Sequence, residues 1–159
     1  MTTTQIGTTP VIRPASSTDL PRMEALLTAN GLPTAGVEQS IDGFLVAEHD
    51  GALVGVVGLE QCCREYGLLR STAVASEWQG RGVGRRLVER AIAEAESRGT
   101  KALYLLTLSA ERYFPSFGFV ETMRDTVPDQ VRATEEFSSI CPASSTVMSL
   151  ELPSEIGER

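Results

Sequence analysis

Three glycines lie within the six residues Gln79-Gly80-Arg81-Gly82-Val83-Gly84. This run stands between an apolar, strand-like stretch over 68–74 and a long amphipathic helix that opens at Val83. Glycines let the backbone turn tightly and approach a ligand closely, and the first N–H groups of a helix have no intrahelical partner. Because the helix dipole places about half a positive charge at the same end, the run predicts a binding site for a phosphate or a diphosphate.

The spacing of the glycines separates this loop from two other phosphate-binding loops. A P-loop requires Lys and then Ser or Thr after its last glycine, whereas Arg85 and Arg86 follow Gly84. A dinucleotide-binding loop is spaced G-x-G-x-x-G, and here the third glycine comes one residue early. An ordinary strand-to-helix turn without a ligand would use glycines as well. The preceding strand, the two arginines and a second motif near residue 114 favour a ligand-binding loop.

The pattern Q-x-x-G-x-G after a strand resembles the acetyl-CoA loop of the GNAT N-acetyltransferase superfamily, V-x-x-x-x-Q/R-x-x-G-x-G/A. Val74, Gln79, Gly82 and Gly84 match that signature. The resemblance implies that acetyl-CoA is the co-substrate, that its diphosphate binds the loop and that the Val74 N–H polarises the acetyl carbonyl. The residues that it assigns to the coenzyme are Ala73, Val74, Gln79, Gly80, Arg81, Gly82, Val83, Gly84, Arg85 and Phe114.

A second motif, over 110–119, resembles the A-x-x-x-Y-x-x-x-G-F segment of the same superfamily, whose tyrosine is thought to protonate the departing thiolate. Phe114 occupies the tyrosine position here, and Tyr113 comes one residue earlier. One residue of a helix corresponds to a rotation of about 100°, so Tyr113 is expected to point elsewhere. Two interpretations stay open: Tyr113 is the catalytic acid, or it packs with its hydroxyl at the surface and water protonates the thiolate.

Charged residues on the central strands are candidates for handling an acceptor amine. An ammonium group must lose a proton before it can attack, and Glu60 and Glu65 are candidate general bases, the alternative being ordinary solvated carboxylates. Arg70 interrupts the apolar strand over 68–74, so its charge must reach solvent, an acidic partner or a substrate carboxylate. We take Arg70 and Ser71 as the candidate substrate-binding residues.

A narrower resemblance covers residues 131–137 and 139–144, together with 69–71 and 110–112. These segments resemble the arsenic-resistance branch of the GNAT acetyltransferases. The resemblance implies a small, amino-acid-like acceptor that carries a carboxylate, and a role in detoxification. The three cysteines, Cys62, Cys63 and Cys141, could suggest trivalent arsenic, but cysteine is often simply a small core residue, and we expect no metal site.

Composition narrows the class of protein. A chain of 159 residues fits one domain with a sizeable core. The net charge is −7 and Lys101 is the only lysine, which disfavours nucleic-acid binding because that requires clustered cations. The sequence contains neither a long apolar span nor a secretory signal pattern, and its odd cysteine count argues against a disulfide framework. We therefore expect a cytoplasmic protein without a membrane partner, and a homodimer is a further expectation from the resemblance.

The hydrophobic periods alternate between those of strands and of helices, which predicts a mixed α+β fold. Read with the resemblance, this is a GNAT-like fold: a central, mostly antiparallel sheet of about seven strands with a splayed parallel pair, and helices on both faces. We expect a disordered segment over 1–10, a single acetyltransferase domain over 11–152 and a tail over 153–159. The predicted strands are 11–13, 44–48, 52–60, 66–74, 101–107, 119–123 and 146–152, and the predicted helices are 19–29, 83–98 and 127–137.

Local signals set several boundaries of these elements. Ser17 or Thr18 is expected to cap the first helix, and Gly99 to end the second. Asp50-Gly51 between apolar runs predicts a tight hairpin, which places His49 beside a turn rather than in a catalytic centre. A short helix is expected over 37–41 and another within the second motif.

Three functions from different classes follow. The favoured one is an N-acetyltransferase that acts on the primary amine of a small, amino-acid-like molecule. The alternatives are a protein or peptide N-acetyltransferase and a non-catalytic acyl-CoA sensor. The feature that favours the sensor is Phe114, which occupies the tyrosine position of the second motif.

Overall fold

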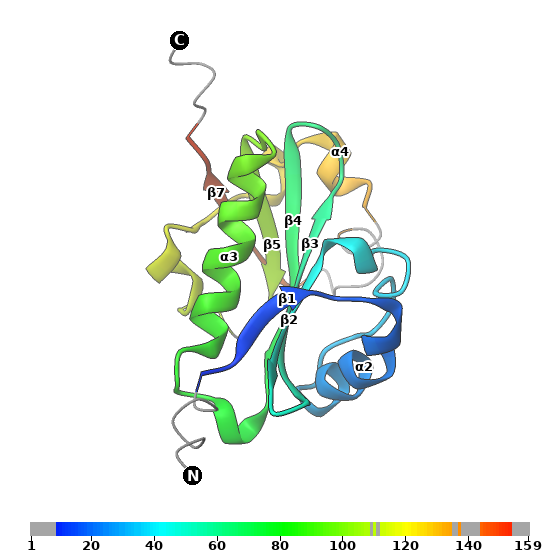
Figure 1. The fold of residues 1–159 in the computed structure, drawn as a ribbon. Coiled ribbons are helices and arrows are strands. Elements are labelled where there is room, and N and C mark those ends of the chain that lie inside the picture. Colours follow the sequence, from blue (N-terminus) through cyan, green and yellow to red (C-terminus); the bar gives the residue numbers. More distant parts are fainter. Residues whose placement is uncertain (1–8, 109, 111, 135–136, 138–143, 154–159) are drawn as a thin grey trace. The chain divides into compact units, whose positions relative to one another are not determined.

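The computed structural model of the chain describes residues 9–108, 110, 112–134, 137 and 144–153 (Figure 1). The predicted disorder before residue 9, the predicted tail after 153 and Cys141 lie outside this part of the chain. Within it, the strands are β1 (Val11–Pro14), β2 (Phe44–His49), β3 (Ala52–Gln61), β4 (Tyr66–Val74), β5 (Ala102–Thr107), β6 (Val120–Glu121) and β7 (Thr146–Glu151). The α-helices are α2 (Leu20–Ala29), α3 (Val83–Ser97) and α4 (Asp129–Arg132), and the 3-10 turns are η1 (Ser17–Asp19), η2 (Ile41–Gly43), η3 (Ser76–Trp78), η4 (Phe114–Phe117) and η5 (Arg124–Thr126).

The strands form one mixed sheet in the order β1-β2-β3-β4-β5-β7-β6. β4 and β5 are parallel, whereas the pairs β1–β2, β2–β3, β5–β7 and β6–β7 are antiparallel. The parallel ladder joins Tyr66, Gly67 and Leu68 to Ala102, Leu103 and Tyr104, although β4 continues to Val74. The predicted α+β class and the single parallel pair are confirmed.

The chain divides into two compact units that interrupt each other in sequence. The first unit holds residues 1–58 and 71–91, and the second holds 59–70 and 92–159. β3, β4 and α3 therefore contribute residues to both units. Each unit is described by itself below, and the single domain expected over 11–152 stays a prediction.

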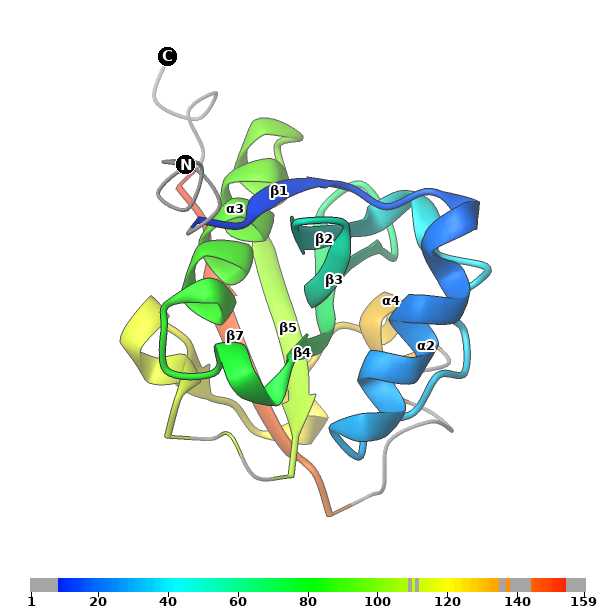
Figure 2. The same cartoon turned by 60° about the horizontal axis from the view of Figure 1, so that its bottom comes forward.

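In the first unit, a tight turn joins β2 to β3, which form a hairpin. Helices cover both faces of this hairpin (Figure 2). Asp50 and Gly51 have φ values of 52° and 80°, as the Asp-Gly signal predicts for a two-residue turn. Successive residues of a strand face opposite sides. Gly55 faces α3, because a Cβ built on it would lie 2.8 Å from Leu87 Cδ1. The absent side chain thus lets α3 approach the hairpin closely.

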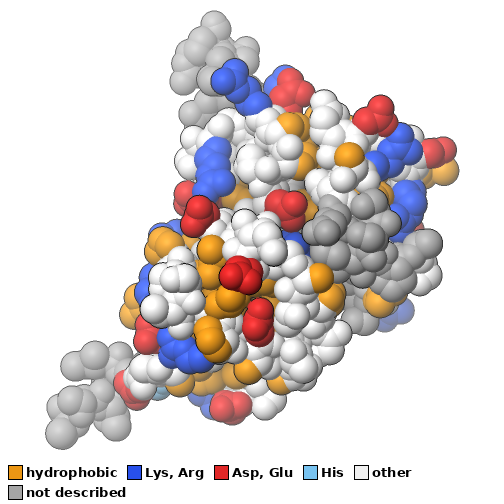
Figure 3. Space-filling view, turned by 90° about the vertical axis from the view of Figure 1, so that its right-hand side faces the viewer, with side chains coloured by type: hydrophobic (Ala, Val, Ile, Leu, Met, Phe, Trp, Pro, Cys, Tyr) orange, Lys and Arg blue, Asp and Glu red, His pale blue; other side chains and the backbone are white. Residues whose placement is uncertain are grey.

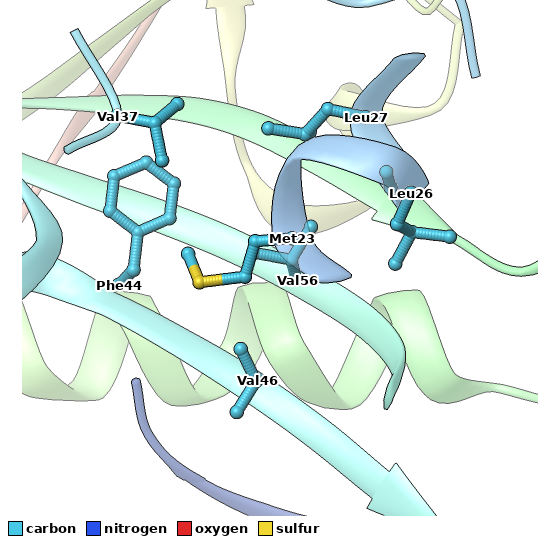
Figure 4. Packing of buried hydrophobic residues seen from close by; sticks show 8 residues of the cluster. Met23, Leu26, Leu27, Val37, Phe44, Val46 and Val56 are labelled. Atoms are coloured by element: carbon cyan, nitrogen blue, oxygen red, sulfur yellow. The ribbon is translucent and has the colours of Figure 1, made fainter. Parts of the chain in front are cut away.

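The opposite face of the same hairpin packs on α2 (Figure 4). The apolar side of α2 contributes Met23, Leu26 and Leu27, as its helical spacing predicts. The other buried members of this cluster are Val37, Phe44, Val46, Val56 and Ala73. Phe44 pairs across the strands with Gly58, and a Cβ on Gly58 would lie 2.5 Å from the Phe44 ring. The fully buried ring therefore requires glycine opposite it.

The second unit is built on β5, which pairs with β7 over its whole length from Ala102 to Thr107. Its core cluster joins residues of β4, α4 and β7 to the segment that follows α4. The buried members are Leu68, Val127, Val131, Phe137 and Val147, and Cys62, Tyr66, Tyr104 and Leu106 pack against them.

Three local predictions were wrong in detail. Neither Ser17 nor Thr18 caps α2, because both lie in η1, and the Asp19 carboxylate accepts the Ser16 N–H at 2.9 Å instead. The helix predicted over 127–137 is shorter: α4 ends at Arg132, and residues 135–136 lie outside the described part. The short helix predicted over 37–41 is a set of turns followed by η2 at Ile41–Gly43.

Candidate active site

The glycine-rich loop lies in the first unit, between η3 and the start of α3. Gly80 and Gly82 have φ values of 80° and 86°, in the left-handed region that favours glycine. A Cβ built on either glycine would meet nothing within 4 Å, and both residues are exposed. Backbone conformation and access for a ligand, rather than crowding by the protein, therefore explain these two glycines.

The first turn of α3 supplies donors beside this loop. Arg86 N–H donates to the Gly82 carbonyl at 3.0 Å and makes the first bond of the helical ladder. The N–H groups of Val83 and Gly84 precede that bond, so helix geometry gives them no intrahelical acceptor. Acidic side chains are absent from this first turn. Donors and helix dipole together suit an anion.

Gln79 fastens the loop to two other elements of the first unit. Its side-chain Nε2 donates to the carbonyl of Val74, the last residue of β4, at 3.0 Å. The same nitrogen lies 3.4 Å from Oδ1 of Asn30, the residue that follows α2. Gln79 thus holds the end of β4 beside the loop, and Asn30 is a partner that sequence reasoning missed.

The end of β4 in the first unit runs from Ser71 to Val74. Ser71 has a φ of 60°, which is a strained value for a non-glycine residue and interrupts the regular strand. Ala73 is buried in the α2 core and Val74 is half-buried. This segment places the predicted coenzyme-binding backbone of Ala73 and Val74 five residues before the loop.

Arg81 lies within the loop, whereas Arg85 and Arg86 lie in the first turn of α3, and all three are exposed. Its guanidinium carbon lies 4.9 Å from the centre of the Trp78 ring, and that ring lies 4.7 Å from the imidazole of His49. The other two arginines have further partners: Arg85 lies 3.4 Å from the Glu89 carboxylate, and Arg86 donates to the Pro10 carbonyl. Sequence reasoning missed Trp78, although it is the only tryptophan and directly precedes the glycine motif.

In the second unit, Arg70 and Glu60 form an ion pair across β4 and β3. The Arg70 side chain is 2% exposed and its Nη1 lies 3.5 Å from Glu60 Oε1. Of the three destinations that the sequence left open for this charge, the acidic partner is the one observed. The pair balances a charge that would otherwise be costly to bury.

Glu65, the other candidate base, lies on the surface of the second unit. Its carboxylate is 3.5 Å from Lys101 Nζ, and both side chains are exposed. Its main-chain carbonyl accepts the Lys101 N–H at 2.7 Å. Both contacts attach the β3–β4 connection to the start of β5.

Tyr113 and Phe114 belong to an aromatic cluster in the second unit. Tyr113 is 39% exposed, and its ring lies edge-on to those of Phe114 and Phe117, at 5.2 and 5.3 Å. Phe114 is buried and lies 5.8 Å from the Phe119 ring. The two neighbours therefore differ in accessibility, as a rotation of about 100° per residue predicts.

Cys62 and Cys63 are free thiols in the connection between β3 and β4. Burial raises the pKa of Cys62 to about 12, and the adjacent Cys63 adds to the rise. A thiol protonated at neutral pH is a poor ligand for soft metals, because the thiolate is the binding form. Among the described residues, no group of three or more His, Cys, Asp or Glu side chains could hold a metal ion.

Charged side chains of both signs are interspersed with hydrophobic ones on the face shown in Figure 3. Each helix in the described part of the chain is too short or too polar to cross a lipid bilayer.

Known proteins resemble this chain in sequence. An amino-acid acetyltransferase of Ralstonia nicotianae is 36% identical over 97 residues, which are 60% of this chain and 22% of that protein. The amino-acid acetyltransferase of Mycobacterium tuberculosis is 29% identical over 123 residues, 70% of this chain and 69% of that protein. The chain thus spans only about a fifth of the Ralstonia relative.

A solved structure resembles the fold. N-acetylglutamate synthase of Neisseria gonorrhoeae, in complex with coenzyme A and N-acetyl-glutamate, superposes with a TM-score of 0.78 at 26% identity, covering 91% of this chain and 35% of that one. The sequence model of the acetyltransferase (GNAT) domain matches residues 40–121, a span that includes β2 to β6, the glycine-rich loop and α3. The chain belongs to the GNAT acetyltransferase family.

Proposed function

We propose that this protein is an acetyl-CoA-dependent N-acetyltransferase whose acceptor is the primary amine of a small, amino-acid-like molecule. The observation that carries the proposal is the loop: two exposed glycines with positive φ lead into a helix whose first N–H groups have no intrahelical acceptor. Membership of the GNAT family and the coenzyme A bound by the Neisseria relative support it.

The residues of the first unit fit such a coenzyme. Main-chain donors over 80–84 and the dipole of α3 suit a diphosphate, and the open space at Gly80 and Gly82 lets it approach the backbone. The end of β4, held by Gln79, would pair with the pantetheine arm through Ala73 and Val74. Acetyl-CoA, when bound, supplies an acetyl thioester. The Val74 N–H is the donor that we assign to its carbonyl oxygen.

Charged and polar residues of the central strands are the candidates for handling the acceptor amine. An ammonium group has no lone pair, so a base must take its proton before it attacks. We assign this role to Glu60, directly or through a water molecule, because its half-buried carboxylate lies on a central strand beside the buried Arg70, whereas Glu65 forms an exposed surface pair. Arg70 and Ser71 are the candidate contacts for the acceptor's carboxylate, and the amino-acid acetyltransferases among the relatives support such an acceptor.

The departing thiolate needs a proton as well. A thiol has a pKa of about 8.5 in cysteine, so water can supply that proton near neutral pH. Phe114 carries no proton that it could transfer, so water and the exposed Tyr113 are the two candidate proton donors at this step.

Release of free thiol from acetyl-CoA in the presence of a panel of amino acids and related amines tests the proposal. Turnover with a small amine, and an acetylated product of the expected mass, is the expected result. Acetylation of a peptide amine alone would favour the peptide alternative. Tight coenzyme A binding without turnover on any amine would favour the sensor, the alternative to which the buried Phe114 lends support.

Substitution of the two candidate bases separates their roles. Glu60→Gln is expected to lower kcat by about 10²-fold or more, the usual contribution of general base catalysis, with unchanged affinity for coenzyme A. Glu65→Gln is the matched control and should retain kcat. The reverse pattern would transfer the role to Glu65.

The narrower form of the proposal is a detoxifying enzyme whose acceptor is an amino-acid-like toxin, as in the arsenic-resistance branch. Its support is the resemblance over 69–71, 110–112, 131–137 and 139–144, of which residues 111, 135–136 and 139–143 lie outside the described part. Amino-acid-like toxins therefore belong in the acceptor panel. Preference for a common amino acid over every toxin would contradict this narrower role.

A further inference from the structure

Trp78 connects the glycine-rich loop to the end of β2 within the first unit. The Arg81 guanidinium carbon lies 4.9 Å from the centre of the indole ring, which is within the range of a cation–π contact. The imidazole of His49, the last residue of β2, lies 4.7 Å from the same ring with an interplanar angle of 56°. The Trp78 ring therefore contacts both Arg81 and His49. Packing against Trp78 is a structural role for His49, which has no part in the proposed chemistry.

Arg81 differs in its contacts from the two arginines in the first turn of α3. Arg85 faces Glu89, and Arg86 donates to the Pro10 carbonyl. Within the part of the chain that the structure describes, Arg81 has the ring contact but no ion pair or hydrogen bond. A guanidinium that lies over an aromatic ring keeps its N–H groups along its edge, where they can donate to an anion.

We infer that Trp78 is a positioning residue, which holds Arg81 so that its guanidinium pairs with a phosphate group of a nucleotide coenzyme at the Gly80–Gly84 loop. The inference rests on the proposed function and deepens it. Main-chain donors supply hydrogen bonds but no full charge, and the protein carries a net charge of −7. A negatively charged protein repels a phosphorylated ligand, and a cation held beside the loop offsets this repulsion locally. Preorganisation of a long, flexible side chain lowers the entropy lost on binding.

The test measures the affinity of coenzyme A by calorimetry for the wild type and for Trp78→Leu, Trp78→Phe and Arg81→Gln. An exposed cation–π contact is worth about a twofold to fivefold change in affinity, so Trp78→Leu is expected to weaken coenzyme A binding by that factor. Trp78→Phe keeps an aromatic face and should retain most of the affinity. Arg90→Gln is the control, because it removes one positive charge from an exposed arginine outside the loop, as Arg81→Gln does within it.

Two further arms separate positioning from a general effect on folding. Trp78→Leu should leave the affinity for pantetheine, which lacks phosphate, unchanged. In the Arg81→Gln background, Trp78→Leu should have no additional effect on coenzyme A, because the residue acts through Arg81. Additive effects of the two substitutions, or equal losses for pantetheine and coenzyme A, would overturn the inference. Wild-type binding of coenzyme A together with turnover of an amine would still uphold the proposed function. A wild type that failed to bind coenzyme A would overturn both.

Discussion

The side-chain amide of Gln79 donates to the main-chain carbonyl of Val74 at 3.0 Å. The bond spans five residues and links the last residue of β4 to the loop that precedes α3. Under the proposed function, one end of this link binds the pantetheine arm and the other binds the diphosphate. The glutamine of the motif therefore fixes the spacing between two binding segments. It can contribute to coenzyme binding in this way without contacting the ligand itself.

Gln79→Ala is expected to weaken coenzyme A binding by about twofold to tenfold, the loss that corresponds to one hydrogen bond in an accessible position. The affinity for pantetheine, which spans only one of the two segments, should change less. Calorimetry with both ligands measures the difference. Gln130→Ala, an exposed substitution in α4, is the matched control. Equal losses for both ligands would show that Gln79 shapes β4 alone.

Two substitutions at Gly82 separate the effect of backbone strain on coenzyme A affinity from the effect of a charge placed beside the ligand. The φ of 86° at Gly82 penalises any side chain by about 1–2 kcal/mol, but a Cβ would meet no protein atom within 4 Å. Gly82→Asn and Gly82→Asp share this strain and nearly the same volume, whereas only Asp adds a negative charge beside the proposed diphosphate. We expect Gly82→Asp to abolish coenzyme A binding and Gly82→Asn to retain measurable affinity. Normal binding by Gly82→Asp would place the diphosphate elsewhere.

Signals that are local in sequence predicted the elements of the proposed coenzyme site well. The apolar run that ends at Val74, the glycines over 80–84 and Gly99, whose φ is 81°, set the limits of β4 and α3 within one residue. The chemistry of these elements depends on backbone conformation, and backbone conformation is what glycine positions and hydrophobic periods encode.

Contacts between residues distant in sequence could not be predicted in the same way. The destination of the Arg70 charge stayed open between three alternatives until the pairing of β3 with β4 brought Glu60 to 3.5 Å. The residues before α2 could not be predicted from local signals either, because Asp19 is held by Arg13, which lies on β1. The role of Trp78 could not be predicted from the sequence, because the turn at η3 is what places its ring beside Arg81.

Gly58 illustrates a packing requirement that can be tested without any ligand. A Cβ at this position would lie 2.5 Å from Cζ of Phe44, which is 1% exposed. Gly58→Ala is therefore expected to lower the free energy of unfolding by about 1–3 kcal/mol, measured by urea denaturation. Phe44→Leu should relieve the clash, so the double variant should lose less stability than the sum of the two single variants. Additive losses would mean that the ring does not oppose the added methyl group.

The Asp19 carboxylate provides a prediction about pH. It is 1% exposed and accepts two hydrogen bonds from Arg13, at 2.8 and 2.9 Å, one from Arg22 at 2.8 Å and one from the Ser16 N–H at 2.9 Å. The bonds from Arg13 above all, opposed by burial, hold the pKa of Asp19 well below its ordinary value of 3.8. A depressed pKa in the folded state means that the carboxylate stabilises the protein above the unfolded-state pKa and loses this contribution as the pH falls toward the folded-state pKa.

Asp19→Asn keeps the shape of the side chain and removes its charge and two acceptor sites, which leaves donors of Arg13 without their partner. We expect this variant to lose about 2 kcal/mol of unfolding free energy at pH 7. The difference from the wild type should stay constant between pH 5 and 8, where the wild-type carboxylate is ionised in both states, and should narrow as the pH falls below about 4. Urea denaturation across this range measures both quantities. Asp19 lies outside the loop over 79–84, so the coenzyme A affinity of Asp19→Asn at pH 7 should equal that of the wild type. A difference in unfolding free energy that widened at low pH would contradict the assignment of Asp19 as an ionised partner of Arg13.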